Sequence, residues 1–216
     1  MKKLLLSFTF CLALLGAFAQ SDKYMKAMQD KVAAIDTTHS VDALKDLSAA
    51  FERIGDAEKT QWLPYYYGAL AQVNAAYMIT TFQKANATVT DPMADKAELL
   101  LNKAEALSKD NSEIYIIRKM IASARMMADP MSRYMQYGPL AQAALETARK
   151  LNPENPRIYL LQAEDKYYTP EQYGGSKVEA KKLFELSLQK YDAAKPATPI
   201  DPNWGRSTVQ YFLSQY

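Results

Sequence analysis

Apolar residues recur at helical spacing along almost the whole chain, and part of this pattern repeats. Three residues of one segment recur 44 positions later, so that Leu107, Asn111 and Tyr115 correspond to Leu151, Asn155 and Tyr159. No run of alternating β-branched residues is present that would indicate a β-sheet. The sequence therefore predicts an all-α fold built from repeated helical units.

Glycine and proline gather between the periodic segments, for example at Gly55 and Gly138-Pro139, where they predict helix boundaries. At Asp91-Pro92 and Asp201-Pro202, an aspartate that can cap free amides precedes a proline suited to the first helical position. The predicted helices cover residues 22–36, 41–54, 59–85, 93–108, 112–128, 138–151, 156–168, 176–193 and 203–215.

A second pattern places a large residue between two small ones, with three and then two residues in between. It occurs as Ala43-Leu47-Ala50, Ala97-Leu101-Ala104, Ala141-Leu145-Ala148 and Ala180-Phe184-Ser187. Small side chains allow two helices to approach closely, and the large side chain fills the groove at the crossing. One such pair cannot bury both of its faces alone, so we expect the pairs to stack into an array.

This arrangement resembles the tetratricopeptide repeat family, most closely over Ala141 to Ala163. There the small-large-small pattern is followed by Asn152-Pro153-Glu154-Asn155-Pro156, which is similar to the proline turn of the family, and by Tyr159 at its aromatic position. Successive final small residues are 54, 44 and 39 positions apart, whereas the family period is about 34. The resemblance implies an α-α superhelix, or solenoid, of about four helix pairs and a C-terminal capping helix with Trp204.

The first residues predict export. Lys2 and Lys3 precede an apolar run, and Ala17-Phe18-Ala19 offers the small residues that a signal peptidase reads. We expect residues 1–19 to be cleaved and residues 20–216 to form a single helical domain that is periplasmic or secreted. The leader is too short to span a bilayer, and no later segment approaches the length that a membrane span needs.

Two further stretches, Tyr168 to Ser176 and Pro202-Asn203-Trp204-Gly205, resemble a group of secreted tetratricopeptide-like proteins from Bacteroidetes. This resemblance implies export and no particular activity.

Charge and composition argue against several functions. The chain has 26 basic and 24 acidic residues, so no broad basic surface for nucleic acid is expected. His39 is the only histidine and Cys11 lies in the leader, which leaves little to bind a metal. Carboxylate pairs such as Glu164 and Asp165 have no accompanying nucleophile and base. We therefore expect no enzyme, no cofactor and no metal site.

The family resemblance implies that the first helix of each pair lines a concave ligand groove. Alignment at Ala148 places eight residues there: Glu113, Ile116, Met120, Arg157, Leu160, Glu164, Tyr167 and Tyr168. Their mixture of charged, apolar and aromatic groups suits an extended peptide, and it equally suits an ordinary solvated surface.

Three functions remain open at this point. The first is a scaffold that binds a peptide or protein partner in the groove. The second is a binder of a small molecule or glycan that uses the many tyrosines as stacking platforms. The third is a helical enzyme, which the absence of a convergent catalytic set disfavours. A contiguous aromatic surface in the structure would favour the second function over the first.

Overall fold

The computed structural model describes residues 22–83 and 86–216, so the predicted leader lies outside the described residues. These residues form helices, turns and connecting segments and no β-strand, which confirms the all-α prediction. None of the described helices is both long enough and apolar enough to cross a membrane.

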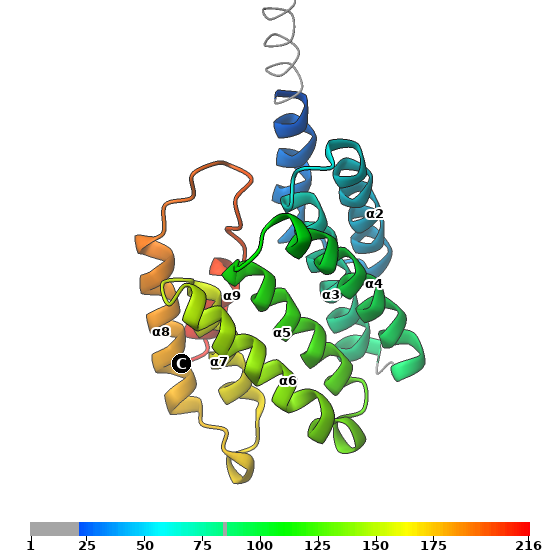
Figure 1. Ribbon diagram of the computed structural model, residues 1–216. Coiled ribbons are helices and arrows are strands. Elements are labelled where there is room, and N and C mark those ends of the chain that lie inside the picture. The colour runs from blue at the N-terminus through cyan, green and yellow to red at the C-terminus, as the bar shows by residue number, and fades with distance from the viewer. Residues whose placement is uncertain (1–21, 84–85) are drawn as a thin grey trace, which may run out of the picture.

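The helices follow one another with short connections. A first helix covers residues 22–35 and is followed by α2 (Val41–Glu58), α3 (Leu63–Gln83), α4 (Ala87–Leu107), α5 (Ser112–Met127), α6 (Pro130–Leu151), α7 (Pro156–Tyr168), the short 3-10 helix η1 (Glu171–Tyr173), α8 (Lys177–Ala193) and α9 (Arg206–Leu213). Neighbours in the chain pack together, notably α2 on α3, α3 on α4, α5 on α6 and α7 on α8. Figure 1 shows these elements side by side, with α2 and α4 at one edge and α8 at the other.

The 44-residue repeat corresponds to equivalent helix boundaries. Asn111 caps α5 by accepting a hydrogen bond from the backbone N–H of Glu113 at 2.9 Å, and Asn155 caps α7 through the N–H of Arg157 at 3.0 Å. Each asparagine lies four residues after a leucine, Leu107 or Leu151, that ends the preceding helix. An asparagine oxygen satisfies one of the free amides at a helix start, so the repeat marks two equivalent junctions between helices.

Three of the four small-large-small patterns are buried as predicted, in α4, α6 and α8. In α2 the prediction is wrong, because the residues that are buried each lie one position after the predicted ones. The buried residues of α2 are Leu44, Ser48, Phe51 and Gly55, and Ser48 donates to the carbonyl of Gly68 in α3 at 2.8 Å. This face is preferred because Phe51 stacks on Tyr67, with ring centroids 5.4 Å apart. Ala43 is exposed, and Leu47 and Ala50 are only partly buried.

Pro92 does not begin a helix as predicted. Helix α4 starts five residues earlier, at Ala87, and Asn86 caps it by accepting from the N–H of Thr88 at 3.0 Å. Proline inside a helix removes one backbone hydrogen bond, and the apolar face of α4 that is buried against its neighbours offsets this loss. Asp91 instead accepts two hydrogen bonds from the guanidinium of Arg133, at 2.7 and 2.8 Å.

Other predicted boundaries also lie inside helices. Gly55 is in α2 against the ring of Tyr65, and Pro139 is inside α6, which begins at Pro130. Asp201 does not cap the last helix. It accepts from the backbone N–H groups of residues 197 and 198 at 2.8 and 3.0 Å and closes a turn. Packing and local turns thus override the glycine and proline signals at these positions.

The segment after α8 returns across the helix array, as Figure 1 shows. The Tyr67 hydroxyl donates to the carbonyl of Ile200 at 3.0 Å, and the Trp204 indole donates to the Tyr66 hydroxyl at 2.7 Å. Residues 200–204 therefore lie on the N-terminal part of α3. This contact, between residues 138 positions apart, joins the C-terminal segment to α3.

Gly205 ends this segment and has a positive φ of 97°, and a Cβ atom there would lie 2.5 Å from the Tyr191 hydroxyl and 2.8 Å from Leu160. We expect Gly205→Ala to lower the free energy of unfolding by about 2–4 kcal/mol, because left-handed strain and overpacking add. Urea unfolding followed by circular dichroism measures this value.

Gly174→Ala is the matched control, because Gly174 has a similar φ of 91° and nothing within 4 Å of its would-be Cβ. That variant should lose only about 1 kcal/mol from backbone strain. Equal losses in the two variants would contradict the close packing at Gly205.

Candidate functional site

The N-terminal ends of α3, α5 and α7 meet in the interior of the protein. Each end contributes one polar side chain, and these are Tyr66, Glu113 and Arg157. The asparagine caps determine where α5 and α7 begin and therefore where Glu113 and Arg157 lie. Two of the predicted groove residues are thus brought together here.

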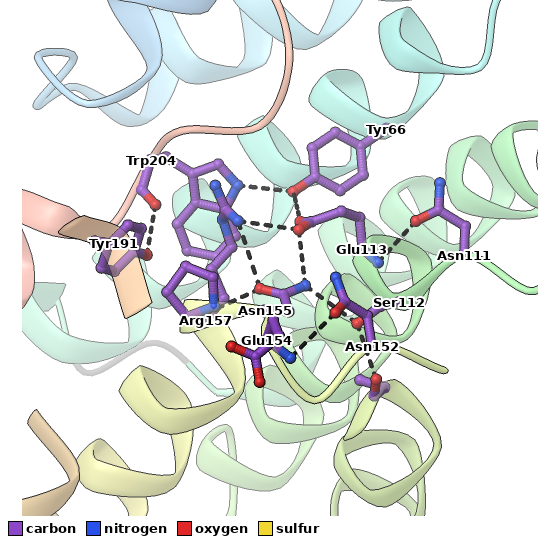
Figure 2. A network of polar contacts seen from close by, with 12 residues as sticks. Tyr66, Asn111, Ser112, Glu113, Asn152, Glu154, Asn155, Arg157, Tyr191 and Trp204 are labelled. Atoms are coloured by element: carbon purple, nitrogen blue, oxygen red, sulfur yellow. Dashed lines mark hydrogen bonds and ion pairs between the residues drawn. The ribbon is translucent and has the colours of Figure 1, made fainter. Parts of the chain in front are cut away.

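Glu113 is the centre of a hydrogen-bonded network, shown in Figure 2. Its carboxylate accepts from Arg157 Nη1 at 3.0 Å, from the Tyr66 hydroxyl at 2.8 Å and from Asn155 Nδ2 at 2.7 Å. Asn155 Nδ2 also donates to the hydroxyl of Ser112 at 3.1 Å. The carboxylate oxygens are thereby satisfied without solvent.

Trp204 of the C-terminal segment covers this network. Its indole donates to Tyr66, and its backbone carbonyl accepts from the Tyr191 hydroxyl at 2.7 Å. The guanidinium of Arg157 lies 5.1 Å from the centroid of the Trp204 ring and 5.7 Å from that of Tyr191 (Figure 2). Both separations fit a cation–π contact. Trp204 and Tyr191 therefore close the network around Arg157.

The electrostatics of the network are those of a closed ion pair. Burial opposes the charge on Arg157, but the Glu113 carboxylate beside it raises the pKa of the guanidinium above its ordinary value. Burial, and then the same carboxylate, also raises the pKa of the Tyr66 phenol. Both groups therefore keep their protons at neutral pH. This arrangement holds the starts of α3, α5 and α7 together.

Several predicted groove residues do not line an open surface. The side chains of Ile116, Met120, Arg157 and Leu160 are buried, and Glu113 is partly buried within the network. The groove expectation is therefore corrected for these positions, because the helices and the C-terminal segment pack over them. Tyr168, at the end of α7, is exposed, whereas Tyr167 and Glu164 are partly buried.

Tyr167 and Tyr168 belong to a contiguous aromatic cluster. Phe212 of α9 lies at its centre, with ring centroids 5.0 Å from Tyr167, 5.9 Å from Tyr168 and 5.6 Å from Tyr211. Tyr216 lies 6.4 Å from Tyr167. Phe212 is buried, whereas Tyr168 and Tyr211 are 70% and 62% exposed. The result is an exposed surface of aromatic rings on a rigid apolar base.

Two lysines of α8 border this cluster. Lys177 Nζ lies 5.0 Å from the centroid of the Tyr167 ring, and Lys181 Nζ lies 5.6 Å from that of Tyr216. Neither ammonium forms an ion pair with any residue that the structure describes. We call the five aromatic residues Tyr167, Tyr168, Tyr211, Phe212 and Tyr216, together with Lys177 and Lys181, the aromatic face.

The sequence analysis did not assign Phe212, Tyr216 or the two lysines to a site. They lie on different helices from Tyr167 and Tyr168, and no local spacing relates them. One usable signal was available, because the last fourteen residues contain four aromatic residues, Trp204, Tyr211, Phe212 and Tyr216, with few apolar neighbours.

Glu164 lies one turn before Tyr168 and carries an unusual carboxyl group. Burial raises its pKa to about 7, while Lys119 acts in the opposite direction and Asp165 adds to the increase. Lys119 is itself buried and donates to Asp165 at 2.7 Å. Lys119 and Asp165 thus offset each other's charge, and the charge of Glu164 is offset least by its neighbours.

Comparisons with known proteins give one informative result. Neither the models of protein families nor the curated proteins match this chain. A solved structure, the HusA haemophore from Porphyromonas gingivalis, matches with a TM-score of 0.77 and 35% sequence identity. The match covers 89% of this chain and 92% of that chain. This chain belongs to the HusA haemophore family.

Because the match covers most of both chains, the HusA haemophore shares the helical architecture described above. The HusA haemophore comes from a member of the Bacteroidetes, the group that the sequence resemblance indicated. The comparison supports a binding protein rather than any particular groove. A ligand needs an exposed surface, and the aromatic face is one such surface.

We expect Glu113→Gln to lower the free energy of unfolding by about 3–5 kcal/mol, because it leaves the Arg157 charge buried without a counter-charge. Glu179→Gln is the matched control, since Glu179 pairs with Lys166 at 2.8 Å on the surface, and such pairs contribute about 0–1 kcal/mol. Urea unfolding of both variants measures the difference. A loss at position 113 no larger than that at position 179 would contradict a closed, charged network.

We expect Glu164→Gln to be neutral at acidic pH and stabilising at alkaline pH. The folded pKa of Glu164, about 7, lies above its unfolded value, so its contribution to stability is present at low pH and is lost as the pH rises through 7. The variant should therefore gain stability relative to the wild type between pH 4.5 and 8 in urea unfolding, by up to about 3 kcal/mol. A difference that does not change with pH would contradict a desolvated carboxyl group.

Proposed function

We propose that this protein binds haem or a related porphyrin on the aromatic face and carries it outside the cytoplasm. The observation that supports this most is its membership of the HusA haemophore family, together with an exposed aromatic cluster at the end of α7. The proposal corresponds to the second function considered from the sequence, a small-molecule binder that uses tyrosines.

The chemistry of a porphyrin matches that of the aromatic face. A porphyrin is a flat, apolar ring system with carboxylates on one edge. Tyr168 and Tyr211 offer exposed rings for stacking, which contributes about 0.5–1.5 kcal/mol for each favourable pair. Lys177 and Lys181 lie at the border, where their ammonium groups can pair with carboxylates. The ligand would thus bind with its ring on the tyrosines and its carboxylates towards α8.

Iron is not required for this mode of binding. Among the usual protein ligands of haem iron, the aromatic face offers only tyrosine, and tyrosine ligates iron as the phenolate. Burial and the nearby Glu164 carboxylate raise the pKa of Tyr168, and burial also raises that of Tyr216. Both phenols are therefore protonated at neutral pH when no ligand is bound. The aromatic face is suited to hold the ring by contact, so a metal-free porphyrin should bind as well.

We also propose that the mature chain begins after Ala19 and is periplasmic or secreted, as the leader over residues 1–19 predicts. The helix pairs would form a tetratricopeptide-like scaffold without enzymatic activity. A protein partner that receives the porphyrin fits this role, but the peptide groove predicted around Arg157 is a weaker candidate because its residues are buried.

We expect Tyr168→Ala and Tyr211→Ala each to weaken the binding of haemin, and of metal-free protoporphyrin, by about tenfold, because each removes one stacking ring. Tyr173→Ala is the matched control, since Tyr173 is 74% exposed and has no aromatic contact within the described residues. Titration followed by the Soret absorbance measures the affinities.

Charge reversal tests the border of the site. Lys177→Glu and Lys181→Glu should also weaken the binding of both porphyrins. Lys182→Glu, on the same helix but without such a ring contact, should not weaken it. A folded wild-type protein that binds no porphyrin would refute the function. Equal losses in the Tyr168→Ala, Tyr211→Ala and Tyr173→Ala variants would refute the aromatic face as its place.

A further inference from the structure

Two methionines of α6 are the most exposed large apolar side chains in the part of the chain that the structure describes. Met131 is 97% exposed and Met135 is 82% exposed, whereas Met28, Met93 and Met120 are buried in the core. Methionine usually fills irregular gaps in an apolar interior, and these two side chains make no such contribution. Packing therefore does not explain why methionine occupies both positions.

The two methionines lie on the same side of their helix. Met131 and Met135 are four residues apart inside α6, and residues at this spacing are neighbours on a helix surface, with Cβ atoms about 5–6 Å apart. The sulfur of methionine directly follows Cγ, and the side chain is unbranched and flexible. The two thioether sulfurs can therefore reach a single ion between them.

Neighbouring side chains leave this position open. The ring of Tyr134 lies along its own helix towards Gly138, where an added Cβ atom would be 3.3 Å from the ring. The guanidinium of Arg133 donates to both carboxylate oxygens of Asp91, at 2.7 and 2.8 Å. The charge of Arg133 is thus compensated, so it does not repel a cation bound nearby.

The start of α6 also carries a negative side chain. A helix start is positive because of its free N–H groups, which by itself disfavours a bound cation. Asp129 caps this start by accepting from the backbone N–H of Ser132 at 3.4 Å, and hydrogen bonds from Ser132 hold the pKa of the Asp129 carboxyl below its ordinary value. Asp129 is therefore ionised at neutral pH and offsets the charge of the helix start.

Thioethers select one class of metal ion. They are soft, uncharged donors, and soft sulfur ligands favour Cu(I), whereas carboxylate and carbonyl oxygens suit Mg²⁺, Ca²⁺ and Mn²⁺. A thioether has no proton to lose, so binding does not compete with protonation as it does at histidine or cysteine. The predicted mature chain has no cysteine, since Cys11 lies in the leader, and its one histidine is His39. The methionines are therefore its main soft ligands.

We propose that Met131 and Met135 form a surface site for a soft monovalent metal ion, Cu(I) or Ag(I), held between their thioether sulfurs. Both ions accept a low number of ligands, so two sulfurs from one helix are sufficient to bind them. An exposed site of this kind exchanges its ion readily, which suits transient binding. This inference is independent of the haem proposal, because it uses no residue of the aromatic face.

The experiment is a titration of the full mature protein, labelled with ¹³C at its methionine methyl groups, with silver nitrate in chloride-free buffer. Silver(I) is the probe because it is soft and, unlike Cu(I), is not oxidised by air. We expect the methyl resonances of Met131 and Met135 to shift together and to saturate at one ion, while those of Met28, Met93 and Met120 stay in place. Zn²⁺ should shift none of them, and acidification from about pH 7.5 to 5.5 should leave the affinity unchanged.

Variants test the pairing of the two sulfurs. Met131→Leu and Met135→Leu should each weaken silver binding by about tenfold or more, because each leaves a single sulfur. Leucine keeps the apolar volume, so the fold is preserved. Gln136→Met added to Met135→Leu should not restore the affinity, because positions 131 and 136 lie on different sides of the helix. His39→Ala is the matched control and should bind silver as the wild type does.

Each outcome decides between sites. Equal silver affinity in the wild type and in Met131→Leu would overturn the site, and restoration by Gln136→Met would overturn its geometry. A loss in His39→Ala would assign the ion to that histidine and overturn the proposal. A protein that binds silver at the two methionines but no haemin would support this site and refute only the haem function. A protein that binds haemin while neither methyl resonance shifts would refute this site alone.

Discussion

The ion pair between Arg157 and Glu113 is the interaction on which the rest of the structure depends. A guanidinium cannot lose its proton in a folded protein, so a buried Arg157 requires a carboxylate at hydrogen-bonding distance, and Glu113 lies at 3.0 Å. This requirement holds the starts of α5 and α7 together. Tyr66 and Trp204 add further hydrogen bonds and cover the pair, which ties α3 and the C-terminal segment to the same point.

Closure of this interior point decides where a ligand can bind. Residues 200–204 and the helices occupy the face that a helical repeat protein could offer to a peptide, and α9 is carried to the end of α7. Phe212 fills the space between Tyr167 and Phe184 and leaves Tyr168 and Tyr211 exposed. The network thereby helps to position the surface that the haem proposal uses.

The aromatic face combines two kinds of contact. It is a set of exposed rings bordered by lysines, which suits a flat ligand that carries an anionic group at its edge. This combination is the one that the haem proposal uses. Membership of the HusA haemophore family agrees with a binding role.

The sequence by itself determined the helical class, most helix positions and the repeat that relates Asn111 to Asn155, because these depend on local patterns of apolar and turn residues. It misplaced the start of α4 and the buried face of α2, where packing outweighs the local signals of Pro92 and Ala50. Only the tertiary structure decided that Arg157 and Trp204 fill the expected groove and that Phe212 joins Tyr168. The physical reason is that a pattern records which residues are buried, whereas contacts between residues 44 or 138 positions apart depend on how whole helices pack.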